Sequence, residues 1–185
     1  MNDIDTELLR KFHAAIDTYP DFPTEGILFR DISPLYRDTR LLDQGMAILE
    51  RRFNFDKIDI IVGIEARGFP IATLLAKSTD KPMVMARKSG KLPGQVKQRH
   101  YGLEYGDAAV EIQVNAIIPG KRVLIIDDLL ATGGTAQATS DLVRDLGAEV
   151  SGIAFLVELF GLNGRDILSQ STQIESLITL PASEK

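Results

Sequence analysis

The chain of 185 residues contains no cysteine. This absence excludes a disulfide framework, a zinc site built from thiolates and a cysteine nucleophile. Any metal would therefore have to be held by oxygen ligands. A chain without thiols is also compatible with a reducing compartment.

The sequence also lacks an apolar run that approaches the roughly 20 residues needed to cross a bilayer. Its first ten residues carry Asp3, Asp5 and Glu7 before any apolar stretch, which is the wrong order for a signal peptide. We therefore expect a soluble, cytoplasmic protein with no membrane partner.

Positive charge is not in excess, because 21 Lys and Arg residues stand against 26 Asp and Glu residues, a net charge of -5. This balance argues against a broad basic surface, so we expect no nucleic-acid partner. Basic residues do gather between Arg87 and Arg99, which leaves room for a local anion site. With 44% hydrophobic and 25% charged residues, we expect a single compact domain over 1–185.

Hydrophobic periodicity predicts helices and strands in alternation. Helical spacing of apolar residues predicts helices over about 5–18, 41–53, 69–78 and 138–146. Short apolar runs predict buried strands over 58–62, 82–86, 123–126 and 150–159, with a further one over 176–180, and period-two alternation predicts a half-exposed strand over 110–114. This order indicates an α/β fold with a largely parallel sheet.

Two segments fit neither pattern. Residues 20–34 are rich in Pro, Gly and Asp yet contain apolar Phe22 and Ile27, so we expect them to pack onto the rest of the protein. Residues 87–106 form a polar interval too long for a simple connector, and we predict a functional or disordered loop there.

The strongest site signal is a predicted buried strand that ends in Asp127 and Asp128 and leads through a small-residue loop into a helix. The loop reads Ala131, Thr132, Gly133, Gly134 and Thr135. Its amides and threonine hydroxyls can surround an anion at the positive end of the helix dipole, at the sheet edge where ligands bind. The acids repel a phosphate but suit hydroxyls or a metal. The combination points to a 5-phosphoribosyl group.

This stretch resembles the phosphoribosyl-pyrophosphate motif of the type I phosphoribosyltransferases, and specifically that of the adenine-using members. The resemblance implies that Asp127 and Asp128 face the ribose hydroxyls while residues 131–135 hold the 5-phosphate. It also implies the family's fold, a largely parallel central sheet flanked by helices, with a small hood at approximately 20–36 and a flexible catalytic loop at approximately 87–106.

A second motif, Gly63 to Phe69, resembles the family's pyrophosphate loop. The resemblance implies that Arg67 is a catalytic residue that binds pyrophosphate, and that a cis peptide lies near Glu65-Ala66. An arginine fork suits phosphate oxygens. Taken alone, a Glu/Arg pair would more often be a surface ion pair.

The polar interval resembles the family's flexible catalytic loop. The resemblance implies that Arg87, Lys88 and Lys91 reach the pyrophosphate as the loop closes and excludes water, that Glu104 handles the proton on the purine ring, and that Tyr105 helps to position substrate. A carboxylate kept from water has a raised pKa, which suits acid/base chemistry. Without the resemblance, two alternatives stay open: the cationic stretch could be a solvated, poorly ordered linker, and Glu104 could be a hairpin glutamate that points at solvent.

The segment around residues 22–34 resembles the hood. The resemblance implies that Phe29 stacks on one face of adenine and Leu159 on the other, with polar recognition from the Leu28 backbone and from Arg30. The competing interpretation is that Phe29 fills part of the hydrophobic core and does not contact a base. Family members commonly have proline where this chain has Glu25, which predicts a looser entry turn.

From the resemblance we expect transfer of the 5-phosphoribosyl group from phosphoribosyl pyrophosphate to adenine, giving AMP and pyrophosphate in purine salvage. Mg²⁺ would be carried mainly by the substrate, without a dedicated protein ligand. A homodimer is expected, with the loop around Arg67 near the interface. Two alternatives stay open: an enzyme of the same type that acts on a 6-oxopurine, and a non-catalytic regulator that senses phosphoribosyl pyrophosphate.

Overall fold

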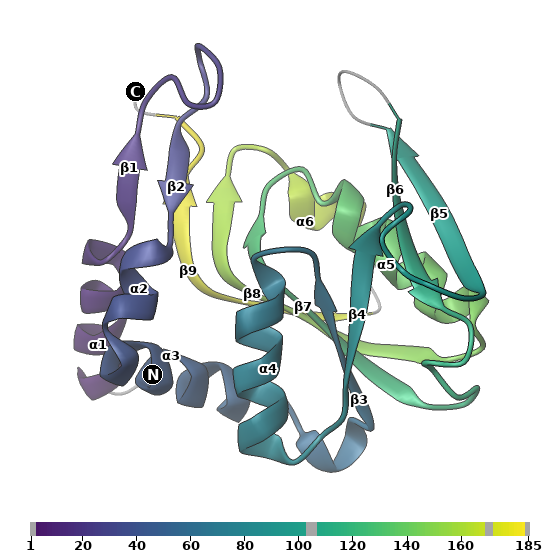
Figure 1. Cartoon of the computed structure of the whole chain (residues 1–185). Coiled ribbons are helices and arrows are strands. Elements are labelled where there is room, and N and C mark those ends of the chain that lie inside the picture. Colours follow the sequence, from purple (N-terminus) through teal and green to yellow (C-terminus); the bar gives the residue numbers. More distant parts are fainter. Residues whose placement is uncertain (1–2, 103–106, 169–171, 184–185) are drawn as a thin grey trace.

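A seven-stranded sheet forms the centre of the protein, and a two-stranded sheet stands beside it (Figure 1). The structure is a computed structural model that describes residues 3–102, 107–168 and 172–183. The strands are β1 (Asp17–Tyr19), β2 (Phe29–Asp31), β3 (Ile60–Ile64), β4 (Met83–Lys88), β5 (Val96–Gly102), β6 (Asp107–Gln113), β7 (Arg122–Leu130), β8 (Glu149–Phe160) and β9 (Gln173–Pro181). The α-helices are α1 (Asp3–Ala14), α2 (Ser33–Arg37), α3 (Thr39–Arg51), α4 (Gly68–Thr79), α5 (Gly134–Asp145) and α6 (Gly164–Ile167), and a short 3-10 helix spans Phe55–Lys57.

The large sheet has the strand order β5-β6-β4-β3-β7-β8-β9. The neighbouring pairs β4-β3, β3-β7, β7-β8 and β8-β9 are parallel. Strand β6 runs antiparallel to both of its neighbours, β4 and β5. The predicted α/β fold with a largely parallel sheet is therefore confirmed. Because the parallel strands share one direction, their carboxyl ends meet at one edge, where such sheets bind ligands.

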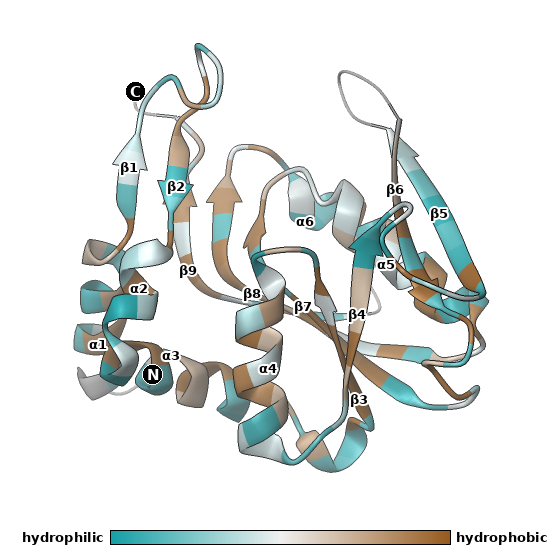
Figure 2. Cartoon of the chain, in the orientation of Figure 1, coloured by the Kyte–Doolittle hydropathy of each residue, from teal (hydrophilic) through white to brown (hydrophobic). Residues whose placement is uncertain are grey.

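Alternate residues of β7 supply the two faces of the sheet. Leu124 and Ile126 belong to the core on the face covered by α1, α3 and α4, whereas Val123 and Ile125 belong to the core beneath α5. Figure 2 shows the central strands as largely hydrophobic and β5 as largely hydrophilic. Burial on both faces explains why the central strands are continuous apolar runs in the sequence.

Two projecting hairpins flank the carboxyl edge. The β1–β2 hairpin stands at one side of this edge and the β5–β6 hairpin at the other (Figure 1). Among the described residues, no helix is both long and apolar enough to cross a membrane.

The first predicted helix is too long by several residues. The helix ends at Ala14, and residues 17–19 form β1, which pairs Asp17 with Asp31. Ile16 is buried, as the helical spacing suggested, but it lies between the helix and the strand. Pairing with a strand distant in sequence overrides the local pattern here.

The predicted loop over 87–106 is wrong for part of its length. Strand β4 continues to Lys88, and Val96 to Gly102 form β5, paired with β6 from Val96↔Gln113 onward. Strand β5 is an edge strand with mostly exposed side chains, so it carries little hydrophobic signal.

Three further expectations need correction. Strand β7 does not end before Asp127 but continues to Leu130, so both acids lie within it. Strand β3 continues through Gly63 to Ile64, beyond the predicted end at residue 62. A Cβ at Gly63 would lie 2.7 Å from Ala72 Cβ on α4, so the close packing of α4 on the strand requires glycine there. The segment 20–34 is only partly packed, since Phe22 is 54% and Ile27 is 47% exposed.

Candidate active site

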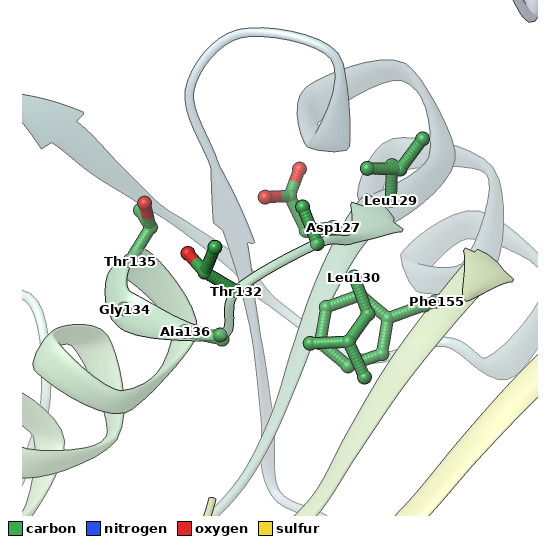
Figure 3. A pocket seen from close by; sticks show the side chains of 10 residues that line it. Asp127, Leu129, Leu130, Thr132, Gly134, Thr135, Ala136 and Phe155 are labelled. Atoms are coloured by element: carbon green, nitrogen blue, oxygen red, sulfur yellow. The ribbon is translucent and has the colours of Figure 1, made fainter. Parts of the chain in front are cut away.

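The turn between β7 and α5 encloses a small cavity. Its volume is about 80 Å³, and it is lined by Asp127, Leu129, Leu130, Ala131, Thr132, Gly133, Gly134, Thr135, Ala136 and Phe155. Figure 3 shows the Asp127 carboxylate and the Thr132 and Thr135 hydroxyls on one side of the turn, with Leu130 and Phe155 packed beneath it. The cavity therefore has polar groups at its mouth and an apolar floor that supports the turn.

Glycine is required in this turn for steric reasons. Gly133 has φ +83°, a left-handed conformation that L-residues rarely adopt, and a Cβ there would overlap the carbonyl oxygen of Gly164. A Cβ on Gly164, in α6, would in turn overlap the carbonyl oxygen of Ala131. The two backbones thus touch, and Gly164 shapes the turn although no sequence motif marks it.

Asp127 and Asp128 lie near the carboxyl end of β7 and share a hydrogen bond, since Asp128 N donates to Asp127 Oδ1 at 2.9 Å. Burial raises the pKa of the Asp127 carboxyl well above its usual range, and the neighbouring negative charge adds to this rise. Burial also raises the pKa of Asp128, although Arg67 opposes the effect. Two adjacent carboxylates, Asp127 half-buried and Asp128 buried, favour partners that donate hydrogen bonds or carry positive charge.

Arg67 is the cation that faces this pair. Its Nη2 lies 2.7 Å from Asp128 Oδ2, and only 6% of the Asp128 side chain is exposed. The guanidinium also lies over the Phe29 ring, 5.4 Å from its centroid, and Nη1 donates to Arg30 O at 3.4 Å. Arg67 therefore links the loop after β3 to β7 and to the β1–β2 hairpin.

The loop that carries Arg67 is held tightly against β7. The Glu65–Ala66 peptide is cis, which confirms the expectation for this loop. A Cβ on Gly68 would lie 2.9 Å from both Asp127 Oδ1 and Ile126 O, so only glycine fits at the start of α4. Tyr36 lies beneath the loop, where its hydroxyl donates to Arg67 O at 3.4 Å.

Tyr36 was not identified from the sequence. Burial raises the pKa of its phenol to about 12, and the negative charge of Asp128 contributes to this rise. No motif marks this residue, because its position depends on how α2 packs against the loop.

Two cations, Arg87 at the end of β4 and Lys91 just after it, are already paired. Arg87 Nη2 lies 3.0 Å and Lys91 Nζ 2.9 Å from Glu65 Oε1, while Lys88 N donates to Glu65 Oε2 at 2.8 Å. The structure thus brings Arg87 and Lys91 to the loop that contains Arg67. The Lys88 side chain is exposed at the end of β4.

Glu111 holds the backbone of the same segment. It accepts hydrogen bonds from the amides of Gly90, Lys91 and Leu92 at 3.1, 2.9 and 2.8 Å. Glu111 is 2% exposed, although the alternating pattern of its strand placed it on the half-exposed face. The segment 90–92 folds over it, and sequence periodicity contains no information about such a cover.

The residues expected to hold the base lie on separate elements. Phe29 begins β2, is half-buried, and packs edge-on against Phe22 with ring centroids 5.1 Å apart. Leu159 is buried near the end of β8. The Arg30 guanidinium is engaged elsewhere, since Nη1 donates to Thr18 Oγ1 at 2.6 Å and Nη2 to Pro181 O at 2.8 Å.

Two of the expected catalytic residues, Glu104 and Tyr105, lie outside the described residues. Within the described ranges, no group of three or more His, Cys, Asp or Glu side chains is placed to hold a metal ion.

Comparison with known proteins places this geometry in context. A family model described as a phosphoribosyl transferase domain matches residues 33–166. An adenine phosphoribosyltransferase of Parasynechococcus marenigrum is 49% identical over 166 residues, which cover 90% of this chain and 96% of that protein.

Solved structures agree with these matches. The crystal structure of adenine phosphoribosyltransferase from Rhodothermus marinus has a TM-score of 0.91 and 44% identity, and the match covers 95% of this chain and 99% of that chain. The Saccharomyces cerevisiae enzyme, crystallised with an iminoaltritol bisphosphate and adenine, has a TM-score of 0.87 and 40% identity over 93% of this chain and 99% of its own.

Proposed function

The chain belongs to the phosphoribosyl transferase family, and on that premise we propose that it is an adenine phosphoribosyltransferase of purine salvage. It transfers the 5-phosphoribosyl group from phosphoribosyl pyrophosphate to adenine and releases AMP and pyrophosphate. The observation that carries this proposal is the small cavity at the β7–α5 turn next to the paired acids and Arg67. The groups suited to bind the 5-phosphate, the ribose diol and the pyrophosphate of one substrate therefore lie next to one another.

The phosphoribosyl end of the substrate occupies the β7–α5 turn in this proposal. The amides of residues 131–135 and the hydroxyls of Thr132 and Thr135 bind the 5-phosphate at the amino terminus of α5. Asp127 and Asp128 accept hydrogen bonds from the ribose hydroxyls. Because these contacts fix the sugar, they hold C1 in place for attack.

Four cations receive the leaving group. Arg67, Arg87, Lys88 and Lys91 surround the pyrophosphate as its bond to C1 breaks and the ribose gains oxocarbenium character. Stabilising charge where it develops in the transition state is the largest contribution that such side chains make. The positions of Arg67, Arg87 and Lys91 around the loop after β3 support this assignment.

Adenine lies between Phe29 and Leu159 in the proposed complex. Since the Arg30 guanidinium is bound to Thr18 and Pro181, we assign recognition of the ring edge to the backbone of Leu28 and Arg30. Glu104 takes the proton from the ring as N9 attacks, and Tyr105 positions the substrate. We further propose that, within one domain, residues 20–36 act as a hood and that the segment 87–106, which includes the end of β4 and β5, carries the catalytic side chains of the lid.

Mg²⁺ fits the acids only as an ion shared with the substrate. The described residues offer the adjacent carboxylates of Asp127 and Asp128 but no cluster of three ligands, which suits an ion carried mainly by pyrophosphate oxygens and water. When bound, it neutralises charge on the pyrophosphate. We also propose a cytoplasmic homodimer with the Arg67 loop and α4 near its interface, which analytical ultracentrifugation tests.

The test of the function is AMP formation from phosphoribosyl pyrophosphate and magnesium with adenine, hypoxanthine or guanine, for the wild type and for Glu104→Ala. We expect turnover with adenine alone and its loss in the variant. Activity only on a 6-oxopurine would refute the assignment of the base site. Tight ligand binding without turnover on any base would instead indicate a regulator.

A further inference from the structure

Glu65 occupies the cations that the proposed function assigns to pyrophosphate. Its Oε1 lies 3.0 Å from Arg87 Nη2 and 2.9 Å from Lys91 Nζ, and its Oε2 accepts the Lys88 amide at 2.8 Å. Arg87 and Lys88 are the last two residues of β4 and Lys91 follows shortly after, whereas Glu65 begins the loop that leads from β3 to Arg67. One carboxylate therefore joins the two parts of the pyrophosphate site.

Glu65 and its cationic partners differ in solvent exposure, and the difference favours exchange of the cations between Glu65 and a ligand. The Glu65 side chain is 7% exposed, but Arg87 is 30% and Lys91 is 48% exposed. The cations can thus be approached from solvent while the carboxylate stays beneath them. Carboxylate and phosphate oxygens accept hydrogen bonds from the same guanidinium and ammonium donors, so Glu65 and a pyrophosphate compete for them.

A separate residue maintains the shape of the segment. Glu111 binds the amides of Gly90, Lys91 and Leu92 rather than cationic side chains. The segment can therefore keep its backbone position while Arg87 and Lys91 change partners. Glu65 accepts one backbone hydrogen bond, from the Lys88 amide, whereas Glu111 accepts three, so the shape of residues 90–92 depends mainly on Glu111.

We propose that Glu65 is a displaceable counter-ion, which neutralises Arg87 and Lys91 until a pyrophosphate group takes them over and which takes them back as pyrophosphate leaves. The inference rests on the proposed function, because it needs these cations to bind the leaving group. Glu65 touches no reacting atom, so it is a positioning residue.

Removal of the Glu65 charge should strengthen the binding of pyrophosphate. Pyrophosphate must separate Glu65 from the cations before it binds them, so the carboxylate lowers affinity for pyrophosphate and speeds its departure. A residue that only held the cations in a productive position would have the opposite effect, since its loss would weaken binding. Changes within one site act mainly on the dissociation rate.

The test uses Glu65→Gln, inorganic pyrophosphate and magnesium, with the dissociation constant measured by isothermal titration calorimetry. We expect pyrophosphate to bind roughly fivefold to tenfold more tightly than to the wild type, the scale of one solvent-exposed ion pair. In steady-state kinetics, KM for phosphoribosyl pyrophosphate should fall together with kcat, because product release becomes slower. Glu111→Gln is the matched control, in which pyrophosphate binding should be unchanged or weaker.

Unchanged or weaker binding in a folded Glu65→Gln protein would overturn the proposal, and so would equal tightening in Glu111→Gln. If Glu65→Gln does not fold, Glu65→Asp carries the test, because its shorter side chain moves the charge away from both cations and should tighten binding to a smaller extent. A wild type that forms no AMP would refute the proposed function, whereas an active wild type without tightening in the variants refutes this inference alone.

Discussion

Arg67 Nη2 lies 2.7 Å from Asp128 Oδ2, so the loop after β3 and the end of β7 are joined by an ion pair at the carboxyl edge of the sheet. The acid is almost entirely buried, whereas 38% of the Arg67 side chain is exposed. The cation is thus accessible to a ligand, while the acid depends on it for charge compensation. This pair places the proposed diol and pyrophosphate contacts next to each other.

Replacing Arg67 should impair catalysis severely. We expect Arg67→Ala to lower kcat/KM for phosphoribosyl pyrophosphate by about 100-fold or more, because a donor to the developing pyrophosphate charge is lost. The unpaired Asp128 should also become harder to ionise, since Arg67 now lowers its pKa. Initial-rate kinetics measures the loss, with Arg37→Ala, an exposed arginine on α2, as the control of equal charge. Similar rates in the two variants would contradict the assignment.

Gly133→Ala should destabilise the protein by more than the strain of a left-handed backbone conformation alone, because Gly133 lies in the tightly packed β7–α5 turn. Gly133 and Gly120 both have φ near +80°, but only at Gly133 does an added Cβ meet backbone, that of Gly164. We expect Gly120→Ala to cost about 1–2 kcal/mol from the left-handed conformation. For Gly133→Ala we expect at least about 3 kcal/mol, from strain and overlap together.

Urea unfolding measures both costs, and KM for phosphoribosyl pyrophosphate should rise only in Gly133→Ala. Equal effects at the two positions would mean that the contact with Gly164 does not shape the turn.

Glu65 should make stability depend on pH in the acidic range. Burial alone would raise its pKa, but the hydrogen bonds from Lys91, Arg87 and the Lys88 amide outweigh it and lower the pKa to about 2, from 4.5. A carboxyl with a lowered pKa stabilises the fold fully above pH 4.5, and this contribution is lost as the pH falls towards 2.

The free energy of unfolding should therefore decrease more steeply between pH 5 and pH 3 in the wild type than in Glu65→Gln. We expect a difference on the order of 1 kcal/mol, because solvent screens the exposed cations. Denaturant titrations at several pH values measure it. Parallel pH dependences of the two proteins would show that Glu65 is not ion-paired in solution.

Gly45→Ala should destabilise the fold although alanine is the better helix former. Gly45 lies within α3, and a Cβ there would overlap the Phe12 ring and lie 3.1 Å from Leu177 Cδ2. Overpacking a closed core costs about 1–3 kcal/mol, which exceeds the gain of about 1 kcal/mol in helix propensity. Thermal unfolding tests this, with Gln44→Ala on the exposed face as a control that should be neutral. A more stable Gly45→Ala protein would show that α1 can move away without cost.

The motifs at residues 63–69 and 123–135 could be identified from the sequence because each couples a buried strand to a short loop. A strand buried on both faces is a continuous apolar run, and the loop that follows must lie at the carboxyl edge of the sheet. Local patterns therefore determined the α/β class and the places where ligand groups gather. The family resemblance added the roles, which no periodicity contains.

Tertiary structure alone decided which side chains meet. Glu111 follows a half-exposed alternation yet is buried under residues 90–92, and β5 carries little hydrophobic signal because most of its side chains are exposed. Gly164 touches the phosphate turn from a distant helix, and Glu65 meets cations more than twenty residues away. Sequence patterns report how each residue relates to its own strand or helix, whereas these contacts depend on the packing of one element against another.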